Sequence, residues 1–243
     1  MNKFIFIIPF YNVSEYITEC AESLISQEYK NWQAVFVDDC STDKSISKIP
    51  FDNRFTITRN ESKRTCLFNI HNAIINANLD NNDIVCLLDG DDKLLNASVC
   101  TLLNDIYMRH KPLFTYGQYL TSTNQMGHCS PINTFKFQNL RTKKLHFASH
   151  LKTFRYSLYK ELMFHDPELN CFKDRNGEFY NMAADVAIMI PLMEIAGVAN
   201  IYFNSSPIYY YRLHKNNDHA IDIELQRKLA GEIFSKPAFK KAD

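Results

Sequence analysis

Residues 1–116 alternate between short apolar segments and segments whose apolar residues recur at helical spacing. The short segments, at residues 4–9, 32–37, 55–58, 84–88 and 114–116, have the length and composition of buried strands. Between them, apolar residues three or four positions apart indicate helices that cover a sheet. Strands that alternate with helices run parallel and are joined by right-handed crossovers. We therefore predict an α/β domain with a mostly parallel central sheet flanked by helices.

Asparagine residues stand where two of these helices are expected to begin. Asn12, with Glu15 three positions later, has the spacing of a capping box. Asn96 precedes an apolar stripe that starts at Val99. We expect both asparagines to cap the first turns of their helices.

The periodic pattern is lost between residues 117 and 180. This stretch is rich in polar and turn-forming residues, so we expect an irregular region there. A helix is predicted near residues 181–196, with an interruption or kink at Pro191. Two short strands, at residues 199–203 and 208–212, are expected to follow it.

Charge and composition limit the classes of partner. The chain of 243 residues is 46% hydrophobic and carries 27 basic and 27 acidic residues, so it has no excess positive charge for nucleic acid. Its apolar runs are shorter than the roughly 20 residues of a membrane span, and no secretory signal is recognisable. Its seven cysteines lack metal-site spacing. We expect a cytoplasmic protein with reduced thiols, no nucleic-acid partner and no membrane insertion.

Three carboxylates, those of Asp89, Asp91 and Asp92, follow the apolar segment at residues 84–88. Repulsion and desolvation make such crowding costly unless a cation offsets it. In an extended chain Asp89 and Asp91 point the same way, with Gly90 between them. Carboxylate oxygens in this arrangement suit Mg²⁺ or Mn²⁺, often together with the phosphate oxygens of a substrate. A plain surface turn is the alternative.

An EF-hand calcium loop is excluded. Counted from Asp89, its fifth, sixth and twelfth positions would be Lys93, Leu94 and Cys100. The loop requires an oxygen ligand, a glycine and a glutamate at those positions.

A second acidic pair, Asp38-Asp39, follows the segment at residues 32–37. Because ligands of parallel sheets bind beyond the carboxyl ends of the strands, we expect both acidic groups to face one site. The chain has only 6 glycines and none of the Gly-rich loops that hold nucleotide phosphates. A nucleotide bound at this edge would therefore need a metal to hold its diphosphate.

Five motifs stand in order along the chain. They are Ile7-Ile8-Pro9-Phe10-Tyr11-Asn12, Val37-Asp38-Asp39-Cys40-Ser41-Thr42-Asp43, Leu88-Asp89-Gly90-Asp91-Asp92, Ala184-Asp185 and Tyr211-Arg212-Leu213-His214. Together they resemble the GT-A-fold glycosyltransferases of glycosyltransferase family 2, over most of the chain. Cys40 is a departure, because the family usually carries Gly or Asn at its position.

The resemblance implies a single GT-A (Rossmann-like) domain over residues 1–243. Its nucleotide-sugar-binding half would be residues 1–116, and its acceptor-binding half residues 117–243. Some relatives are fused to another enzyme domain, so the resemblance also raises a fusion as an expectation for this chain.

The resemblance also assigns the donor-binding residues. It implies that the nucleotide and its sugar contact Pro9, Tyr11, Asp38, Asp39, Arg64, Asp89 and Gly90. Each has a structural alternative: a capped turn at a strand end for the aspartates, and a solvated side chain for Arg64.

Metal binding and catalysis are assigned in the same way. The resemblance implies Mn²⁺ (or Mg²⁺) held by Asp89 and Asp91 with His214 and His219, and Asp185 as the base that takes a proton from the acceptor hydroxyl. The alternatives are surface histidines, and an aspartate that only stabilises the start of a helix.

The implied reaction moves a hexose, glucose or galactose, from a UDP-sugar to a hydroxyl acceptor on a protein or glycan. A narrower likeness, carried by residues 149–154 and 217–219 among others, is to a subgroup found in bacteria and large DNA viruses. Some of its members are linked to glycosylation of collagen hydroxylysine. Lys152 and Arg155 are expected to lie near the acceptor or the diphosphate. A sugar nucleotidyltransferase and a non-catalytic nucleotide-sugar binding module stay open as alternatives. The stereochemical outcome, inversion or retention, also stays open.

Overall fold

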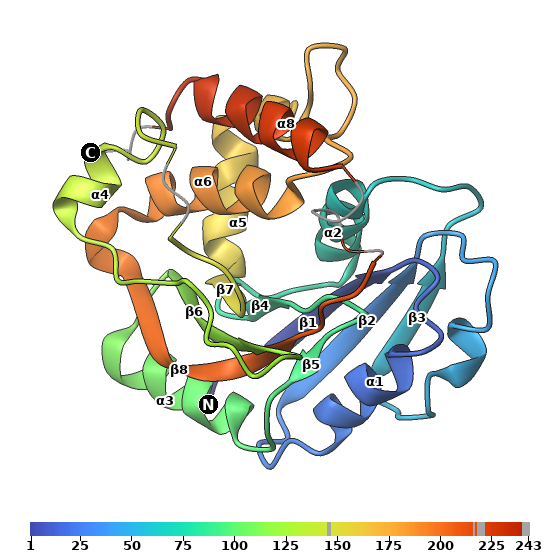
Figure 1. The fold of residues 1–243 in the computed structure, drawn as a ribbon. Helices are drawn as coiled ribbons and strands as arrows, with labels where there is room; N and C mark the ends of the chain where they lie inside the picture. The colour runs from blue at the N-terminus through green and yellow to red at the C-terminus, as the bar shows by residue number, and fades with distance from the viewer. Residues whose placement is uncertain (145–146, 216, 218–221, 240–243) are drawn as a thin grey trace.

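A mixed sheet runs through the molecule in the strand order β3-β2-β1-β4-β7-β6-β8-β5 (Figure 1). The computed structural model describes residues 1–144, 147–215, 217 and 222–239. Within them the strands are β1 (Phe4–Phe10), β2 (Trp32–Asp38), β3 (Phe55–Arg59), β4 (Ile84–Leu87), β5 (Lys93–Leu94), β6 (Phe114–Thr121), β7 (Lys152–Arg155) and β8 (Ile201–Tyr211). The predicted α/β class and the five strands expected in residues 1–116 are confirmed.

The sheet is parallel on one side and mixed on the other. β3, β2, β1 and β4 are paired in parallel. β7 is antiparallel to β4 and β6, β5 is antiparallel to β8, and β6 is parallel to β8. The parallel strands all end at the same edge, so their carboxyl ends can build one site.

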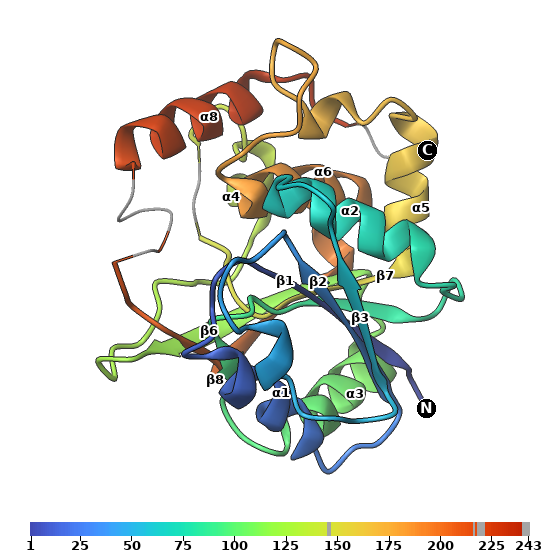
Figure 2. The ribbon, with the colours of Figure 1, turned by 90° about the vertical axis from the view of Figure 1, so that its right-hand side faces the viewer.

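Helices cover both faces of this sheet (Figures 1 and 2). They are α1 (Ile17–Ile25), α2 (Cys66–Asn76), α3 (Val99–His110), α4 (Thr134–Gln138), α5 (Tyr156–His165), α6 (Ala184–Ala196) and α8 (Ile223–Ser235), with 3-10 turns η1 (Ile46–Lys48), η2 (Asn170–Phe172) and η3 (Val198–Asn200). β1 supplies both cores: Ile5 and Ile7 pack with α2, α5 and α6, whereas Phe4, Phe6 and Ile8 pack with α1 and α3. No helix within the described residues is long and apolar enough to cross a bilayer.

Several expectations about local structure were wrong. Residues 152–165, expected to be irregular, form β7 and α5. The two strands expected after α6 are one strand, β8, because register shifts opposite Gly117 and Gln118 absorb the polar segment. Asn204 satisfies the backbone there by bonding to the carbonyl and amide of Ser206. α6 runs through Pro191 without the interruption that was one of the two expectations there, and a kink at Pro191 stays a prediction.

Neither asparagine caps a helix. α1 begins at Ile17 with Tyr16 as its N-cap, and Asn12 instead accepts a hydrogen bond from the Thr42 amide at 2.8 Å. α3 has Ser98 as its N-cap, and Asn96 accepts from the Ser98 amide at 3.0 Å. In both places the short amide side chain stabilises a loop before the helix, a competing use of such residues.

Candidate active site

A cleft of about 300 Å³ opens beyond the carboxyl ends of β1 and β4. Residues expected to bind donor, metal or acceptor line it together: Pro9, Tyr11, Asp39, Asp89, Gly90, Asp91 and Asp185. They come from the ends of β1 and β2, from the turn after β4 and from the start of α6. The topology therefore gathers residues from both halves of the chain at one edge.

The acidic turn after β4 is closely packed against β1. Its Gly90 amide donates to the Pro9 carbonyl at 3.3 Å, and the Asp92 amide donates to the Asp89 carbonyl at 3.0 Å. A Cβ atom at Gly90 would lie 2.6 Å from the Cβ of Phe10. The turn therefore requires glycine at this position, which leaves Asp89 and Asp91 on either side of it.

Asp92 is buried and joins the acidic turn to β8. Its Oδ2 accepts from the Tyr209 hydroxyl at 2.7 Å, and its Oδ1 accepts from the Arg212 amide at 2.7 Å. The Tyr209 hydroxyl also lies 3.3 Å from Asp89 Oδ2 and accepts from the Asp89 amide at 3.2 Å. One tyrosine thus orients both carboxylates.

Crowding perturbs these carboxyl groups. Burial raises the pKa of Asp89 to about 6, with further contributions from the charges of Asp91 and Asp185, while Lys152 acts in the opposite direction. Burial, Asp91 and Asp89 raise the pKa of Asp92 well above its usual range. Carboxylates that repel one another in a buried turn favour a bound cation.

Asp91 lies directly beside His214. His214 Nε2 is 2.8 Å from Asp91 Oδ2, and the Tyr16 ring stacks on the imidazole at 5.1 Å between centroids. The His214 amide donates to Asn217 Oδ1 at 2.7 Å. Asp91 and His214, two of the four predicted metal ligands, are thus held together by neighbours, whereas His219 lies outside the described residues.

Asp91 and His214 together offer few ligands, as expected for a metal ion that a substrate also coordinates. Within the part of the chain that the structure describes, no three His, Cys, Asp or Glu side chains gather closely enough to hold a metal ion. A carboxylate and an imidazole, with other positions left to phosphate oxygens and water, match how Mn²⁺ or Mg²⁺ is commonly held at nucleotide diphosphates.

Asp39 faces the cleft at the end of β2. Its Oδ1 accepts from the Arg64 amide at 2.7 Å and from the Asn60 side chain at 2.8 Å. Nearby, Tyr11 is 39% exposed, and Lys63 Nζ lies 3.6 Å from its ring centroid. A carboxylate and an exposed aromatic ring at one end of the cleft can bind a nucleoside by hydrogen bonding and stacking.

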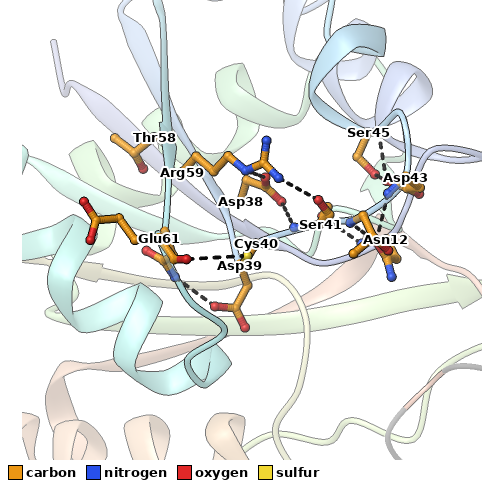
Figure 3. Close-up of polar contacts among 12 residues, drawn as sticks. Asn12, Asp38, Asp39, Cys40, Ser41, Asp43, Ser45, Thr58, Arg59 and Glu61 are labelled. Carbon is orange, nitrogen blue, oxygen red and sulfur yellow. Dashed lines mark hydrogen bonds and ion pairs between the residues drawn. The ribbon is translucent and has the colours of Figure 1, made fainter.

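Asp38 and the Arg64 guanidinium lie outside the walls of this cleft. Asp38 is fully buried, accepts from the Ser41 amide at 2.9 Å and lies 3.3 Å from Arg59 Nε (Figure 3). Arg64 reaches Asp39 through its backbone, and its guanidinium carbon lies 5.5 Å from the Phe68 ring centroid. Both residues shape the loop that presents Asp39.

Cys40, the departure from the family pattern, adopts a φ of +65° in this loop. Gly and Asn adopt this left-handed conformation more readily than other residues. The Cys40 thiol reaches the Glu61 carbonyl at 3.9 Å (Figure 3). The loop therefore keeps the backbone conformation that the usual residues favour.

Asp185 occupies the first turn of α6, after Ala183 in the left-handed conformation with a φ of +59°. It is half-buried and lines the cleft that Asp89 and Asp91 also line. Its charge contributes to the raised pKa of Asp89, so the two carboxylates are near one another. Asp185 can thus meet a second substrate that enters beside a bound donor.

His150 and Lys152 also line the cleft. Lys152 was expected near the acceptor or the diphosphate, whereas no role was predicted for His150. The His150 ring stacks on Tyr209 at 4.4 Å and on Tyr211 at 5.3 Å, and its Nδ1 lies 3.9 Å from Asp89 Oδ2. The sequence signal for this pair is that His150 and Lys152 are two positions apart. In an extended segment, residues at this spacing point to the same side of the chain. Residues 117–180 were expected to be irregular, which hid the strand β7 and its pairing with β4.

Comparison with known proteins settles the family. The family model described as glycosyl transferase family 2 matches residues 5–163. The chain belongs to glycosyl transferase family 2. The predicted family and GT-A fold are confirmed, and the narrower collagen-related subgroup stays a prediction.

Known glycosyltransferases match parts of the chain. Glycosyltransferase GlyA of Streptococcus pneumoniae is 32% identical over 128 residues, which are 52% of this chain and 18% of GlyA. An uncharacterized glycosyltransferase of Haemophilus influenzae is 30% identical over 119 residues, or 46% of this chain and 45% of that protein. The chain thus spans less than half the length of these two relatives.

Solved structures share the fold. TarS of S. aureus with UDP-GlcNAc gives a TM-score of 0.64 at 20% identity, covering 90% of this chain and 61% of that chain. Mannosyltransferase PcManGT of Pyrobaculum calidifontis with GDP-Man and Mn²⁺ gives 0.57 at 17% identity, covering 90% and 59%. At these identities the similarity concerns the fold.

Proposed function

We propose that this chain is a metal-dependent glycosyltransferase that transfers a hexose, glucose or galactose, from a UDP-sugar to a hydroxyl acceptor. The observation that carries the proposal is the single cleft lined by Asp39, Asp91 and Asp185. Membership of glycosyl transferase family 2 supports the reaction class. TarS and PcManGT, which were solved with UDP-GlcNAc and GDP-Man, support a nucleotide-sugar donor.

Each group that lines the cleft, and His214 beside Asp91, has a chemical task. Tyr11 and Asp39 bind the nucleoside, and Asp91 with His214 would hold Mn²⁺. A bound metal ion would neutralise the charge that develops on the leaving diphosphate. Asp89, held by Tyr209, faces the donor beside them.

Asp185 acts on the acceptor. Its carboxylate takes the proton from the acceptor hydroxyl as that oxygen bonds to the anomeric carbon and the bond to the diphosphate breaks. This role requires an inverting reaction. A product that retains the anomeric configuration of the donor would contradict the role of Asp185 as base.

The acceptor is proposed from the resemblance alone: a hydroxyl on a protein or glycan, with collagen-type hydroxylysine as the first candidate. A donor screen tests this function. The full chain is incubated with Mn²⁺ and UDP-glucose, UDP-galactose, UDP-GlcNAc or GDP-mannose, with and without a hydroxylysine peptide, and nucleotide release and glycopeptide are measured. We expect acceptor-dependent release of UDP from one hexose donor.

Asp91→Asn provides the matched test of the metal site, with Asp105→Asn as control. Asp105 is an exposed carboxylate on α3 that lies 3.7 Å from Arg109. We expect loss of Mn²⁺-dependent release in Asp91→Asn only. Full activity of Asp91→Asn, or of the wild type in a chelator, would contradict the proposal. Pyrophosphate release from a nucleoside triphosphate and a sugar phosphate would favour a nucleotidyltransferase, and UDP binding without turnover would favour a binding module.

A further inference from the structure

Lys152 brings a buried positive charge to the wall of the cleft. It is the first residue of β7 and pairs with Leu87 at the end of β4, just before the acidic turn. Only 5% of the residue is exposed, and it lines the cleft with Asp89 and Asp185. An ammonium group in this position needs partners, since burial without them is costly.

The described residues supply few partners for this ammonium. Its Nζ lies 3.3 Å from His150 Nδ1, and no carboxylate of residues 1–144, 147–215, 217 and 222–239 forms an ion pair with it within 4.0 Å. An ammonium carries three N–H donors and no acceptor, so His150 Nδ1 must accept one of them. Two donors are left for groups in the cleft.

Arg155, the other basic residue of β7, behaves differently. It donates to the Asn82 carbonyl at 3.2 Å, and its guanidinium carbon lies 5.2 Å from the Tyr107 ring centroid. These contacts lie at the far end of the strand, away from the cleft. Lys152 is the basic residue of β7 that lines the cleft.

The positive charge of Lys152 also offsets part of the acidic charge of Asp89 and Asp91, which line the same cleft. That long-range effect uses the charge of the ammonium but none of its hydrogen atoms. Its remaining donors call for an oxygen atom within hydrogen-bond distance.

We propose that Lys152 binds an oxyanion of the donor and so positions the donor beside Asp89. This inference rests on the proposed function. The oxyanion can come from the diphosphate or from a carboxylate on the donor sugar, and both would accept charge-assisted hydrogen bonds. UDP carries the diphosphate but no sugar carboxylate. Lys152 therefore contributes to the binding of UDP alone only if its partner is the diphosphate.

The test compares Lys152→Met with wild type and with Lys160→Met. Lys160 is an exposed lysine on α5 that donates to Asn81 at 3.0 Å, away from the cleft. Calorimetry with Mn²⁺ measures the Kd of UDP, UDP-glucose and UDP-glucuronic acid for each full-length variant. Thermal melting shows whether each variant is folded. Lys152→Arg tests whether a retained charge restores affinity.

If the diphosphate is the partner, Lys152→Met binds UDP and both UDP-sugars about 10- to 100-fold more weakly, the effect of losing a charged hydrogen bond. If a sugar carboxylate is the partner, only UDP-glucuronic acid is affected. Lys152→Arg recovers most of the affinity, and Lys160→Met binds as wild type.

A folded Lys152→Met variant with wild-type Kd values would overturn the inference while leaving the proposed function intact. If this variant does not fold, Lys152→Gln takes its place and the same result counts against the inference. A wild type that binds none of the three nucleotides with Mn²⁺ would overturn both.

Discussion

His214 Nε2 lies 2.8 Å from Asp91 Oδ2, although 123 positions separate the two residues in the chain. β8 brings them together, because Tyr209 and Arg212 bind the acidic turn on either side of the strand end. An imidazole placed this close to a carboxylate at a cleft wall suits a divalent metal.

The first prediction concerns this pair. His214→Ala should raise the Mn²⁺ concentration needed for half-maximal UDP binding by about tenfold or more, since even residues that only orient metal ligands contribute that much. Titration of Mn²⁺ against UDP binding measures it. His110→Ala, at the end of α3, serves as control. An unchanged Mn²⁺ requirement in His214→Ala would exclude the imidazole as a ligand.

Asp185→Asn should separate donor binding from catalysis. The amide keeps the shape of the side chain but cannot take a proton, so kcat should fall by about 100-fold or more. The Kd of UDP with Mn²⁺ should stay at the wild-type value, because the nucleoside and metal groups are elsewhere in the cleft. Steady-state kinetics and calorimetry provide the two values. Wild-type kcat in Asp185→Asn would show that another group serves as base.

Tyr209→Phe removes one hydroxyl that serves two carboxylates. Asp92 would lose its 2.7 Å hydrogen bond inside the protein, which should lower the free energy of unfolding by about 1–3 kcal/mol. Because Asp89 loses its support as well, affinity for the nucleotide sugar should fall. Tyr202→Phe, also on β8, is the matched control. Equal stability and affinity in Tyr209→Phe and wild type would contradict this role.

Arg141 and Glu194 form a buried ion pair near the C-terminal end of α6, whereas Asp185 lies in the first turn of that helix. Arg141 contacts both carboxylate oxygens, at 2.6 and 2.8 Å, and donates to the Ile233 carbonyl at 2.7 Å. Arg141→Ala should cost about 3–5 kcal/mol of unfolding free energy, because Glu194 is left buried and unpaired.

Urea denaturation measures this loss, with exposed Lys143→Ala as control. Replacing both partners, as Arg141→Met with Glu194→Leu, should recover most of the stability. If Arg141→Ala lowers the free energy of unfolding by less than about 1 kcal/mol, the pair behaves like a surface ion pair, which contradicts the prediction.

The ion pair of Asp52 and Arg54 gives a prediction about pH. Hydrogen bonds from the Arg54 side chain lower the pKa of Asp52 to about 2, against the effect of burial. A folded-state pKa below the unfolded value of about 3.9 stabilises the protein above that value, and the contribution is lost as pH falls toward 2.

Asp52→Asn should therefore be less stable than wild type near neutral pH, and the difference should shrink between about pH 4 and pH 2. Urea denaturation across this range measures the difference. Asp105→Asn, which alters an exposed pair, should show little difference at any pH. A constant difference for Asp52→Asn would contradict a pKa shift at this residue.

Local patterns determined the parallel part of the sheet and the place of its acidic residues. Strand and helix periodicity act over a few residues, so β1 to β4 and the positions of Asp39, Asp89 and Asp91 at one edge could be predicted from sequence. The order of the family motifs added Asp185 and His214, which local chemistry alone would not have distinguished from ordinary polar residues.

The tertiary structure decided which side chains meet at that edge and which stay buried. Asp38 and Asp39 are neighbours in sequence, yet one supports the loop and the other faces the cleft. His150, Lys152 and Tyr209 join the acidic turn through strands that pair across long stretches of chain, such as the 117 positions between Tyr209 and Asp92. Strand pairing over such separations depends on the packing of the whole sheet, which no local pattern encodes.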